Sequence, residues 1–595
     1  MTTKATRSPR RRTVIALAVV LAVLAAFIVR LVDIQVVNAD DHIAESKERA
    51  LGAARTLYGQ RGAIVDETGQ PLAGSILLYD AQLDPSNVRT ITRKDAAGES
   101  VKVTWEQTSA QIAAITGQTP EEVRAIVEAA LANDPKSQYA LLAKGLSTEQ
   151  YRDLADLDIP FLYFEPHPAR TYPDGAVAGN LVGFVGVDGD PLAGLEKSED
   201  ACLAARDGSE TFERGKDGVV IPGTEERDDA VDGGTLQLTI NRDLQWFLQQ
   251  LIAEQAQNMG AQSGAIMVTE VATGKVRAVA EYPTVDPNNV DASAEADRAS
   301  RAFTQWFEPG STFKALTASA LVDGAGQNAS STEVVPDREE FANGAVVVDA
   351  FWHDPTNYTL AGVLVDSSNV GISKFSERID PQARYDYLRK FGIGEGSAIG
   401  FEGELSGLLH PVSDWDNQML YDTSYGQGVT TTLPELMGAY GAIANNGLRM
   451  PLSIVEGCAK PDGTVVAPDA PEPVRVISED SAKTVQQMLE QVFVQGGVSR
   501  DVAIPGYRVA GKTGTGQKVD EGTGRYKDGV YFTTMIGFAP ADDPQYLVAV
   551  TLDEPTAVRS SAANASAWQK AMTQVLKTYR VMPSTTAPEL LPVFG

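Results

Sequence analysis

One long apolar run dominates the start of the chain. Residues 14–29 read VIALAVVLAVLAAFIV, and apolar residues continue beyond Arg30 as far as Val37. A stretch of this length can cross a hydrocarbon core of roughly 30 Å. Residues 1–12 carry five basic side chains and no acidic one, which is typical of the cytoplasmic flank of a membrane span. The pattern predicts a cytoplasmic tail at 1–12 and a transmembrane helix at 13–37, with a cleaved signal peptide as the alternative.

The chain after this run mixes strand and helix patterns. Residues 61–85 alternate strand-like runs with Gly and Pro turns. Residues 105–157 repeat apolar positions at helical spacing and contain two sequences, TPEE and STEQ, that are typical of helix starts. Residues 205–234 are polar and rich in Gly and Asp, as expected of a connector. We therefore expect a first domain at 38–235.

A second domain is predicted at 236–580, where strand and helix patterns are denser. Helices and strands intermix there without a regular βαβ alternation, so the fold class expected for the chain is α+β, with an antiparallel sheet flanked by helices. The final residues, 581–595, contain three prolines and are expected to form a flexible tail. The strand patterns of the second domain cover 235–240, 264–283, 507–516, 530–540 and 546–553, and its clearest helix patterns cover 311–324 and 433–447.

Charge and composition narrow the function. The chain has 50 Lys and Arg against 79 Asp and Glu, for a net charge of −29. Such an acidic surface argues against nucleic acid as a partner, because phosphate binding needs clustered positive charge. The four histidines are scattered, so no metal site is expected. Cys202 and Cys458 fall in different predicted domains, and we expect them to remain unpaired.

Ser311 and Lys314 form the only S-x-x-K sequence of the chain, within EPGSTFK. Residues three apart on a helix share one face, so the lysine amine can approach the serine hydroxyl. Serine is a weak nucleophile unless a base lies within hydrogen-bond reach, and a lysine of lowered pKa can be that base. In isolation the pair fits equally a helix cap followed by an exposed lysine.

Two further polar segments follow in the same domain. Ser367-Ser368-Asn369 offers two hydroxyls and an amide, although such a triplet is also typical of a polar turn. Lys512-Thr513-Gly514-Thr515 offers a cation, two hydroxyls and a glycine that permits close approach of a ligand backbone, which suits a substrate carboxylate. The alternative is a phosphate-binding loop, because GYRVAGKT fits G-x-x-x-x-G-K-[ST].

The order S-x-x-K, S-x-N, K-T-G resembles that of the penicillin-binding proteins, the serine acyltransferases of peptidoglycan synthesis. The segment TSYGQGVTTTLPELMGAYGAIANNG is similar to another part of that family's catalytic domain. RGAIVDETGQPLA from Arg61 and RTYPDGAVAGNLVGFVG from Arg170 resemble the non-catalytic pedestal, or dimerisation-type domain, of class B members. The resemblance is strongest to the division-specific, septal type, with an elongation-type enzyme as the alternative.

The resemblance implies a role for each candidate residue. Ser311 would attack the D-Ala-D-Ala bond of a stem pentapeptide, with Lys314 as base. Ser367 and Lys512 would pass a proton to the leaving amine. Asn369 would hold the donor peptide, and Thr513, Gly514 and Thr515 would border the carboxylate site.

The resemblance also implies a setting for the enzyme. It implies a catalytic domain outside the cell membrane, on a single-pass anchor with a cytoplasmic N-terminus, and no cofactor. The ligands implied are peptidoglycan stem peptides, their lipid-linked precursor and β-lactams. The implied protein partners are a polytopic glycan-polymerising glycosyltransferase and other division proteins. A β-lactamase, a D,D-carboxypeptidase and a penicillin-binding scaffold are the alternatives.

Overall fold

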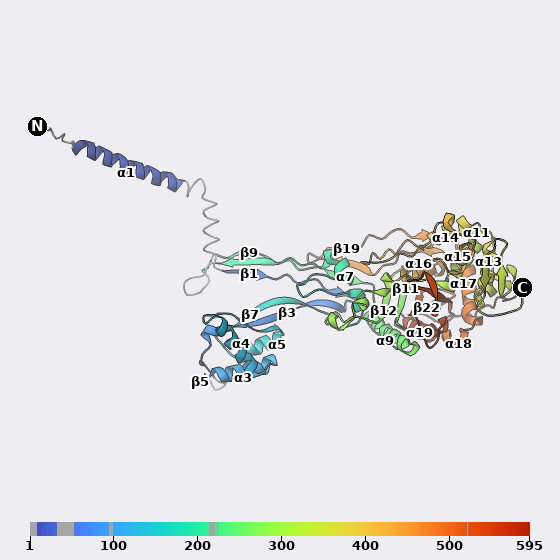
Figure 1. Ribbon diagram of the computed structural model, residues 1–595, viewed down its shortest axis with the longest axis horizontal. Helices are drawn as coiled ribbons and strands as arrows, with labels where there is room; N and C mark the ends of the chain where they lie inside the picture. Colours follow the sequence, from blue (N-terminus) through green and yellow to red (C-terminus); the bar gives the residue numbers. More distant parts are fainter. Residues whose placement is uncertain (1–8, 33–52, 95–98, 213–220, 223, 521) are drawn as a thin grey trace. The chain divides into compact units, whose positions relative to one another are not determined.

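The computed structural model of the 595-residue chain describes residues 9–32, 53–94, 99–212, 221–222, 224–520 and 522–595 (Figure 1). The chain divides into two compact units. One comprises residues 1–59 with 205–231, and the other comprises 60–204 with 232–595. This division differs from the expected boundary at residue 235, because strands from both sides of that position share one sheet.

The first unit contains the N-terminal helix α1 (Pro9–Val32). Its segment Thr13–Val32 has a mean hydropathy of 2.9 and is long and apolar enough to cross a membrane. Residues 33–37 of the predicted span and residues 1–8 of the predicted tail lie outside the described residues. The unit also holds a three-stranded antiparallel sheet made of β1 (Ala53–Leu57), β8 (Gly208–Phe212) and β9 (Glu226–Asp228).

A seven-stranded sheet runs through the second unit and joins the two sequence regions. Strand β2 pairs in parallel with β10, and β10 pairs antiparallel with β18, which comes from far along the chain. The hydrophobic core is continuous across this junction, from Ile64 and Leu236 to the C-terminal sheet. The strands are β19 (Val465–Val466), β18 (Val455–Ala459), β10 (Thr235–Leu238), β2 (Ile64–Val65), β3 (Pro71–Leu83) and β6 (Ala140–Leu146), with β7 (Leu162–Thr171) also paired to β3.

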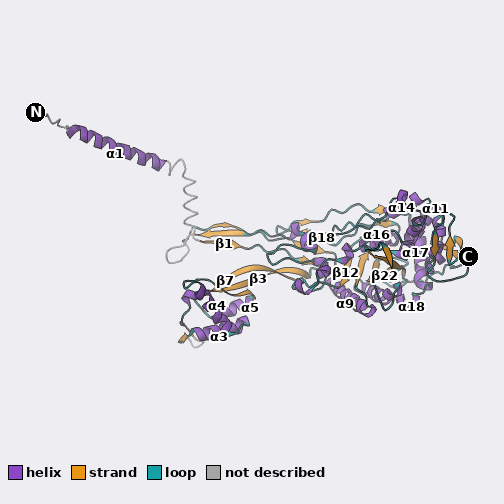
Figure 2. Ribbon diagram, in the orientation of Figure 1, coloured by secondary structure: helices purple, strands orange, loops and turns teal. Residues whose placement is uncertain are grey.

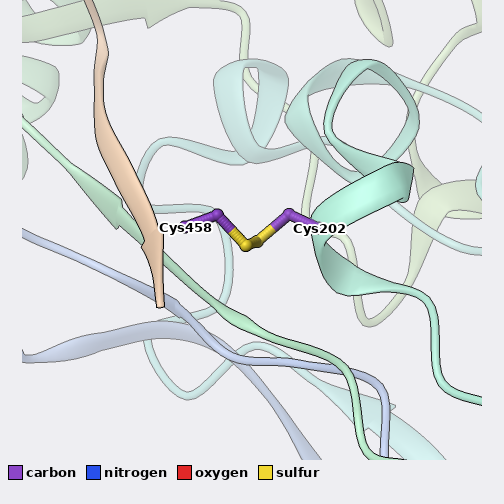
Figure 3. Close-up of a disulfide and its surroundings, with 2 residues drawn as sticks. All are labelled: Cys202 and Cys458. Atoms are coloured by element: carbon purple, nitrogen blue, oxygen red, sulfur yellow. A yellow bond between two sulfur atoms is a disulfide. The ribbon is translucent and has the colours of Figure 1, made fainter. Parts of the chain in front are cut away.

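The prediction that the two cysteines remain unpaired is wrong. Cys202 and Cys458 form a disulfide with a Cα–Cα distance of 5.9 Å (Figure 3). Strand β18 brings Cys458 opposite Leu236 of β10, and the backbone N–H of Gly234 donates to the Cys202 carbonyl at 2.8 Å. The expectation rested on a domain boundary at residue 235, which lies within this sheet. Both cysteines belong to the same compact unit, so the disulfide joins two segments of one unit.

A small helical subdomain carries its own core. Its helices α3 (Trp105–Thr116), α4 (Pro120–Asn133) and α5 (Thr148–Ala155) confirm the helical pattern of 105–157, and each starts with a capping box. The caps at Thr119 and Ser147 belong to the two predicted start sequences. Hydrophobic residues of these helices pack with β6 in a separate cluster. The hairpin of β4 (Ile91–Lys94) and β5 (Ser100–Val103) completes this subdomain.

The predicted C-terminal sheet is confirmed as a five-stranded antiparallel sheet with β21 at one edge. Figure 2 shows its strands β12 and β22 (orange) among the helices (purple) of the second unit. Helices α9 (Arg242–Met259) and α19 (Ala565–Thr578) pack together against it, and Trp568 of α19 donates to the Val548 carbonyl at 3.0 Å. The strands in spatial order are β12 (Val276–Tyr282), β11 (Ser263–Glu270), β23 (Tyr546–Asp553), β22 (Arg525–Ala539) and β21 (Ala510–Asp520).

Helices and short turns beside this sheet carry the candidate site. The predicted helix at 311–324 begins later than expected: Gly310–Phe313 form the 3-10 turn η5, and α11 follows at Lys314–Ala325. The φ of +53° at Gly310 and the preceding Pro309 set this tighter entry. Further helices of this region are α12 (Leu360–Val365), α13 (Asn369–Ser376), α14 (Pro381–Lys390), α15 (Met419–Tyr425), α16 (Leu433–Ala444) and α17 (Glu479–Gln495).

The C-terminal tail also differs from its prediction. Thr359 donates from its hydroxyl to the Pro592 carbonyl at 2.7 Å, and Gly595 donates from its N–H to the Asn357 carbonyl at 2.9 Å. The ring of Phe594 lies 5.1 Å from that of Tyr358. Residues 589–595, here called the C-terminal strap, therefore lie against strand β16 (Thr356–Thr359), which pairs with β13 (Thr332–Val335).

Candidate active site

Ser311 and Lys314 meet as the sequence predicts. The Lys314 amine lies 2.6 Å from the Ser311 hydroxyl oxygen. It also lies 2.7 Å from Asn369 Oδ1, 2.9 Å from the Ser367 carbonyl oxygen and 3.4 Å from the Ser367 hydroxyl. The amine of the S-x-x-K segment is thus held by the S-x-N segment, which lies more than fifty residues along the chain.

The S-x-N segment occupies the short connection between two helices. Thr359 caps α12 with its hydroxyl, Ser367 takes a left-handed φ of +58°, and Ser368 caps α13. The left-handed backbone at Ser367 reverses the chain between the helices. Because the carbonyl and the side chain of Ser367 both lie near the Lys314 amine, this turn determines two of its contacts.

Lys512 approaches Ser367 from the edge strand β21. Its amine donates to the Ser367 hydroxyl at 2.9 Å and to the Thr513 carbonyl at 3.2 Å. The Ser367 hydroxyl therefore lies between the two lysines. Thr515, two residues after Thr513 on the same strand, accepts from the Ser561 N–H at 3.2 Å.

Position 514 requires a glycine for a packing reason that the sequence does not reveal. A Cβ at this position would lie 2.7 Å from the Pro309 carbonyl oxygen and 2.8 Å from Thr312 Cγ2. The glycine thus admits the η5 turn itself against β21, which brings Ser311 beside Thr513 and Thr515. The same strand excludes the phosphate-loop alternative, because β21 continues to Asp520 where that motif requires a helix.

Burial lowers the affinity of both lysines for a proton. It lowers the pKa of Lys314 well below its ordinary range, the charge of Lys512 lowers it further, and the nearby Asp349 opposes both. Burial alone lowers the pKa of Lys512 to about 7. Both side chains have 0% of their surface exposed. One of the two amines can therefore be neutral while the other carries a proton.

The contacts of Lys314 specify where its lone pair points. The Ser367 carbonyl and Asn369 Oδ1 can only accept, so they take N–H groups of the amine. The Ser311 hydroxyl is a partner that can donate. A neutral Lys314 therefore accepts a hydrogen bond from Ser311, which is the arrangement of a nucleophile and its general base.

A cleft of about 460 Å³ opens over these groups. Tyr425, from the TSYGQG segment, places its ring 5.9 Å from the Lys314 amine. The cleft is lined by Gly310, Ser311, Ala350, Phe351, Asp366, Ser367, Asn369, Tyr425, Gln427, Thr513, Thr515, Gln517, Tyr531, Arg559, Ser560 and Ser561. All the predicted site residues except the buried Lys314, Lys512 and Gly514 border this space, and those three lie directly behind it.

Sequence reasoning missed the carboxylate behind the S-x-N segment. Asp349 accepts hydrogen bonds from Ser368, Asn369 and Val370, although it lies nineteen or more residues before them. No motif marks it, because its role depends on where strand β15 (Val346–Val348), which pairs with β14 (Arg338–Glu340), ends. Within the described residues, no group of three or more His, Cys, Asp and Glu side chains is arranged to hold a metal ion.

Two known domain families match this chain. The penicillin-binding protein transpeptidase domain matches residues 264–576, which include all the site residues described above. The penicillin-binding protein dimerisation domain matches residues 56–190. The pedestal and catalytic regions predicted from the sequence are therefore those of one protein family.

Relatives and solved structures agree with this match. Penicillin-binding protein PbpB of Mycolicibacterium smegmatis is 36% identical, with 92% of this chain and 87% of the relative covered. Peptidoglycan D,D-transpeptidase FtsI of Escherichia coli is 31% identical, with 95% and 91% covered. A peptidoglycan synthetase from Bifidobacterium adolescentis superposes with a TM-score of 0.71 at 28% identity, covering 91% of this chain and 99% of that one.

Solved structures of one related protein hold a β-lactam ligand. Penicillin-binding protein 3 of Mycobacterium tuberculosis, complexed with aztreonam, superposes with a TM-score of 0.68 at 29% identity, covering 90% of this chain and 99% of that one. Together with a serine–lysine pair of the required geometry, these similarities establish the family. The chain belongs to the class B penicillin-binding proteins and is a serine-type peptidoglycan D,D-transpeptidase.

Proposed function

We propose that Ser311 is the nucleophile that takes the acyl group from D-Ala-D-Ala in a stem pentapeptide. The observation that carries this proposal is the Lys314 amine, 2.6 Å from the Ser311 hydroxyl and held by two acceptors of the S-x-N segment. Neutral Lys314 takes the proton as Ser311 Oγ bonds to the carbonyl carbon of the penultimate D-Ala.

The proton then needs a route to the leaving group. The Ser367 hydroxyl lies between Lys314 and Lys512 and accepts from the latter at 2.9 Å. As the amide C–N bond breaks, Ser367 donates its proton to the departing D-Ala nitrogen and is reprotonated from the lysines. The serine proton is thereby transferred to the amine, and the acyl-enzyme is left at Ser311.

Strand β21 supports the binding of the donor peptide. As an edge strand it offers backbone groups to an extended peptide, and Asn369 at the opposite side of the cleft can hold the peptide by its amide. The hydroxyls of Thr513 and Thr515 and the Lys512 charge suit the terminal carboxylate. The N–H groups of Ser311 and Thr515 are the proposed oxyanion donors.

Attack on the acyl-enzyme by an amine of a neighbouring stem forms the cross-link and releases Ser311. Attack by water instead gives D,D-carboxypeptidation as a side reaction. β-Lactams carry a reactive amide and a carboxylate, and the related protein of Mycobacterium tuberculosis has been solved with aztreonam and with ampicillin. We infer that this chain is acylated by the same class of compound at Ser311.

The cellular setting is proposed from the anchor and the relatives. Helix α1 supports a single-pass anchor, and its basic N-terminal flank favours a cytoplasmic N-terminus with the catalytic unit outside. The Cys202–Cys458 disulfide suits an oxidising, extracytoplasmic location. The relative named FtsI supports a septal role in division. A polytopic glycan-polymerising glycosyltransferase and other division proteins are the proposed partners.

Labelling with a fluorescent penicillin tests the nucleophile. Membranes containing the intact protein should show covalent labelling, and Ser311→Ala should abolish it because no other group attacks the ring. Ser560→Ala is the matched control, since Ser560 lines the same cleft. Labelling of the Ser311→Ala protein at the parent level would show that another residue is the nucleophile.

A further inference from the structure

Asp349 lies directly behind the S-x-N segment, with 3% of its side chain exposed. Its Oδ1 accepts from the backbone N–H of Asn369 at 2.5 Å and of Val370 at 2.9 Å. Its Oδ2 accepts from the Ser368 hydroxyl at 2.6 Å. One carboxylate thus binds three consecutive residues at the start of α13.

These bonds fix the orientation of Asn369. Its backbone is tied to Asp349, and its side-chain amide donates to the Val348 carbonyl at 3.1 Å. Its Oδ1 is thereby turned toward the Lys314 amine at 2.7 Å. Movement of Asp349 would displace an acceptor that directs the lone pair of Lys314 toward Ser311.

A histidine lies on the other side of the carboxylate. His353 Nε2 is 3.0 Å from Asp349 Oδ2, and His353 Nδ1 is 3.0 Å from the Asp354 carbonyl oxygen. Both of these neighbours accept, while a neutral imidazole has one N–H to give. The two contacts are satisfied together by the doubly protonated ring, which carries a positive charge.

The groups around His353 favour that charged form. Burial lowers its pKa, but the hydrogen bonds to Asp349 and to the Asp354 carbonyl outweigh this and raise the pKa, and the charge of Asp337 adds to the increase. Aromatic rings complete the surroundings: Tyr358 lies edge-on at 5.8 Å and Phe351 at 6.1 Å. The Tyr358 hydroxyl donates to Asp366 at 2.9 Å.

We propose that Asp349 and His353 are a positioning pair for acylation, in which the His353 imidazolium holds the Asp349 carboxylate and this carboxylate holds Ser368 and Asn369 around Lys314. The pair rests on the proposed function, because it acts only through the Ser311–Lys314 site. The pair also balances charge. The Asp349 carboxylate opposes the lowering of the Lys314 pKa, and the His353 imidazolium beside it reduces this opposing effect of Asp349.

The first test measures acylation by fluorescent penicillin over a range of concentrations, which separates the acylation rate constant from non-covalent affinity. Asp349→Ala should lower the rate constant by about 100-fold, because a small displacement of a catalytic group has such an effect. Asp349→Asn keeps an acceptor and should lower the rate constant by about 10-fold. Asp354→Asn is the matched control, since Asp354 contributes its backbone carbonyl, and it should acylate like the parent.

Each variant is also examined for folding by thermal unfolding at the assay pH. Asp349 variants that are folded and acylate at the parent rate would overturn the proposal. If Asp349→Ala does not fold, the acylation rates of Asp349→Asn and His353→Gln are compared with that of the parent and test the proposal instead. The Ser311→Ala variant distinguishes failure of the two proposals. If Ser311→Ala is still labelled at the parent level, Ser311 is not the nucleophile. If labelling depends on Ser311 but the Asp349 variants acylate at the parent rate, only the proposed role of the Asp349–His353 pair is refuted.

The second test measures how the effect of the His353 substitution on acylation depends on pH. A purely structural contact would not produce such a dependence. A raised histidine pKa means that the interaction is present at low pH and is lost as pH rises through that pKa. The ratio of parent to His353→Gln acylation rates should therefore exceed one at about pH 6 and fall to one at higher pH. NMR titration of the His353 ring should show its pKa falling in Asp349→Asn. A ratio that does not vary with pH would overturn the proposed charge on His353.

Discussion

At the scale of single residues, the proposed mechanism requires opposite protonation states of the two buried lysines behind the cleft. Lys314 must be neutral to take the Ser311 proton, and its amine has two acceptors and one donor around it that fit this state. Lys512 must be charged to bind a carboxylate and to supply a proton through Ser367. Burial lowers both pKa values, with the value for Lys512 reaching about 7.

This difference predicts a pH optimum for acylation. The second-order rate constant for a carboxylate-bearing β-lactam should rise with pH as Lys314 becomes neutral, and should fall above about pH 7 as Lys512 loses its proton. Stopped-flow acylation across pH measures both limbs. In Lys512→Ala the alkaline limb should be absent and the rate lower by about 10²-fold or more. A parent profile that keeps rising through pH 9 would contradict the assigned role of Lys512.

The sequence indicates which motif residues come together, but it does not reveal the residues that support them. Ser311 and Lys314 are three residues apart, so local geometry brings them together. Asp349 and His353 lie in a segment without a recognisable pattern, and their contacts depend on how β15 meets α13. Gly514 was read as room for a ligand, whereas its close neighbour is the η5 turn. Such contacts are set by tertiary packing and leave no local signal.

At the scale of elements, periodic segments were predicted and long-range pairings were not. Strands β22 and β23 and helices α3 to α5 follow from their own apolar spacing. The C-terminal strap contacts Thr359 across 233 residues. The three prolines of 581–595 suggest a loose tail, because a local pattern does not reveal a contact with a segment so far away in the chain. The Cys202–Cys458 disulfide spans 256 residues, so its partners also depend on the sheet that joins β10 and β18.

Loss of this disulfide should destabilise the second unit without removing its chemistry. The double variant Cys202→Ser and Cys458→Ser frees a chain segment of 256 residues, and such a loss typically costs about 2–5 kcal/mol of unfolding free energy. Denaturant unfolding of the purified protein measures the change. Penicillin acylation should persist while the variant is folded, since neither cysteine lines the cleft. Unchanged stability would show that the bond does not stabilise the second unit by restricting its unfolded chain.

At the scale of the whole molecule, the anchor and the catalytic site have separate tasks. The cleft is lined by residues between 310 and 561 of the second unit, and α1 lies in the first. The pattern of the N-terminal run predicted this anchor helix directly. The domain boundary expected at residue 235 stays a prediction, and the seven-stranded sheet takes strands from both sides of it.

An ectodomain that begins near Asp40 should therefore be soluble and still acylated by penicillin at about the rate of the intact protein. Its function in cells should be lost, because membrane confinement raises the effective concentration near lipid-linked substrate and membrane partners. Complementation by this ectodomain, exported on an unrelated cleavable signal, is the measurement. Full complementation would show that the N-terminal segment serves only for targeting.

In the proposed reaction, Ser311 carries the acyl group. Mass spectrometry of the protein after brief exposure to penicillin, followed by proteolysis, measures this most directly. We expect one added penicilloyl group, located on Ser311 in the peptide that contains EPGSTFK, and none after Ser311→Ala. An adduct on any other residue, or a protein that remains unmodified while folded, would show that Ser311 is not the nucleophile.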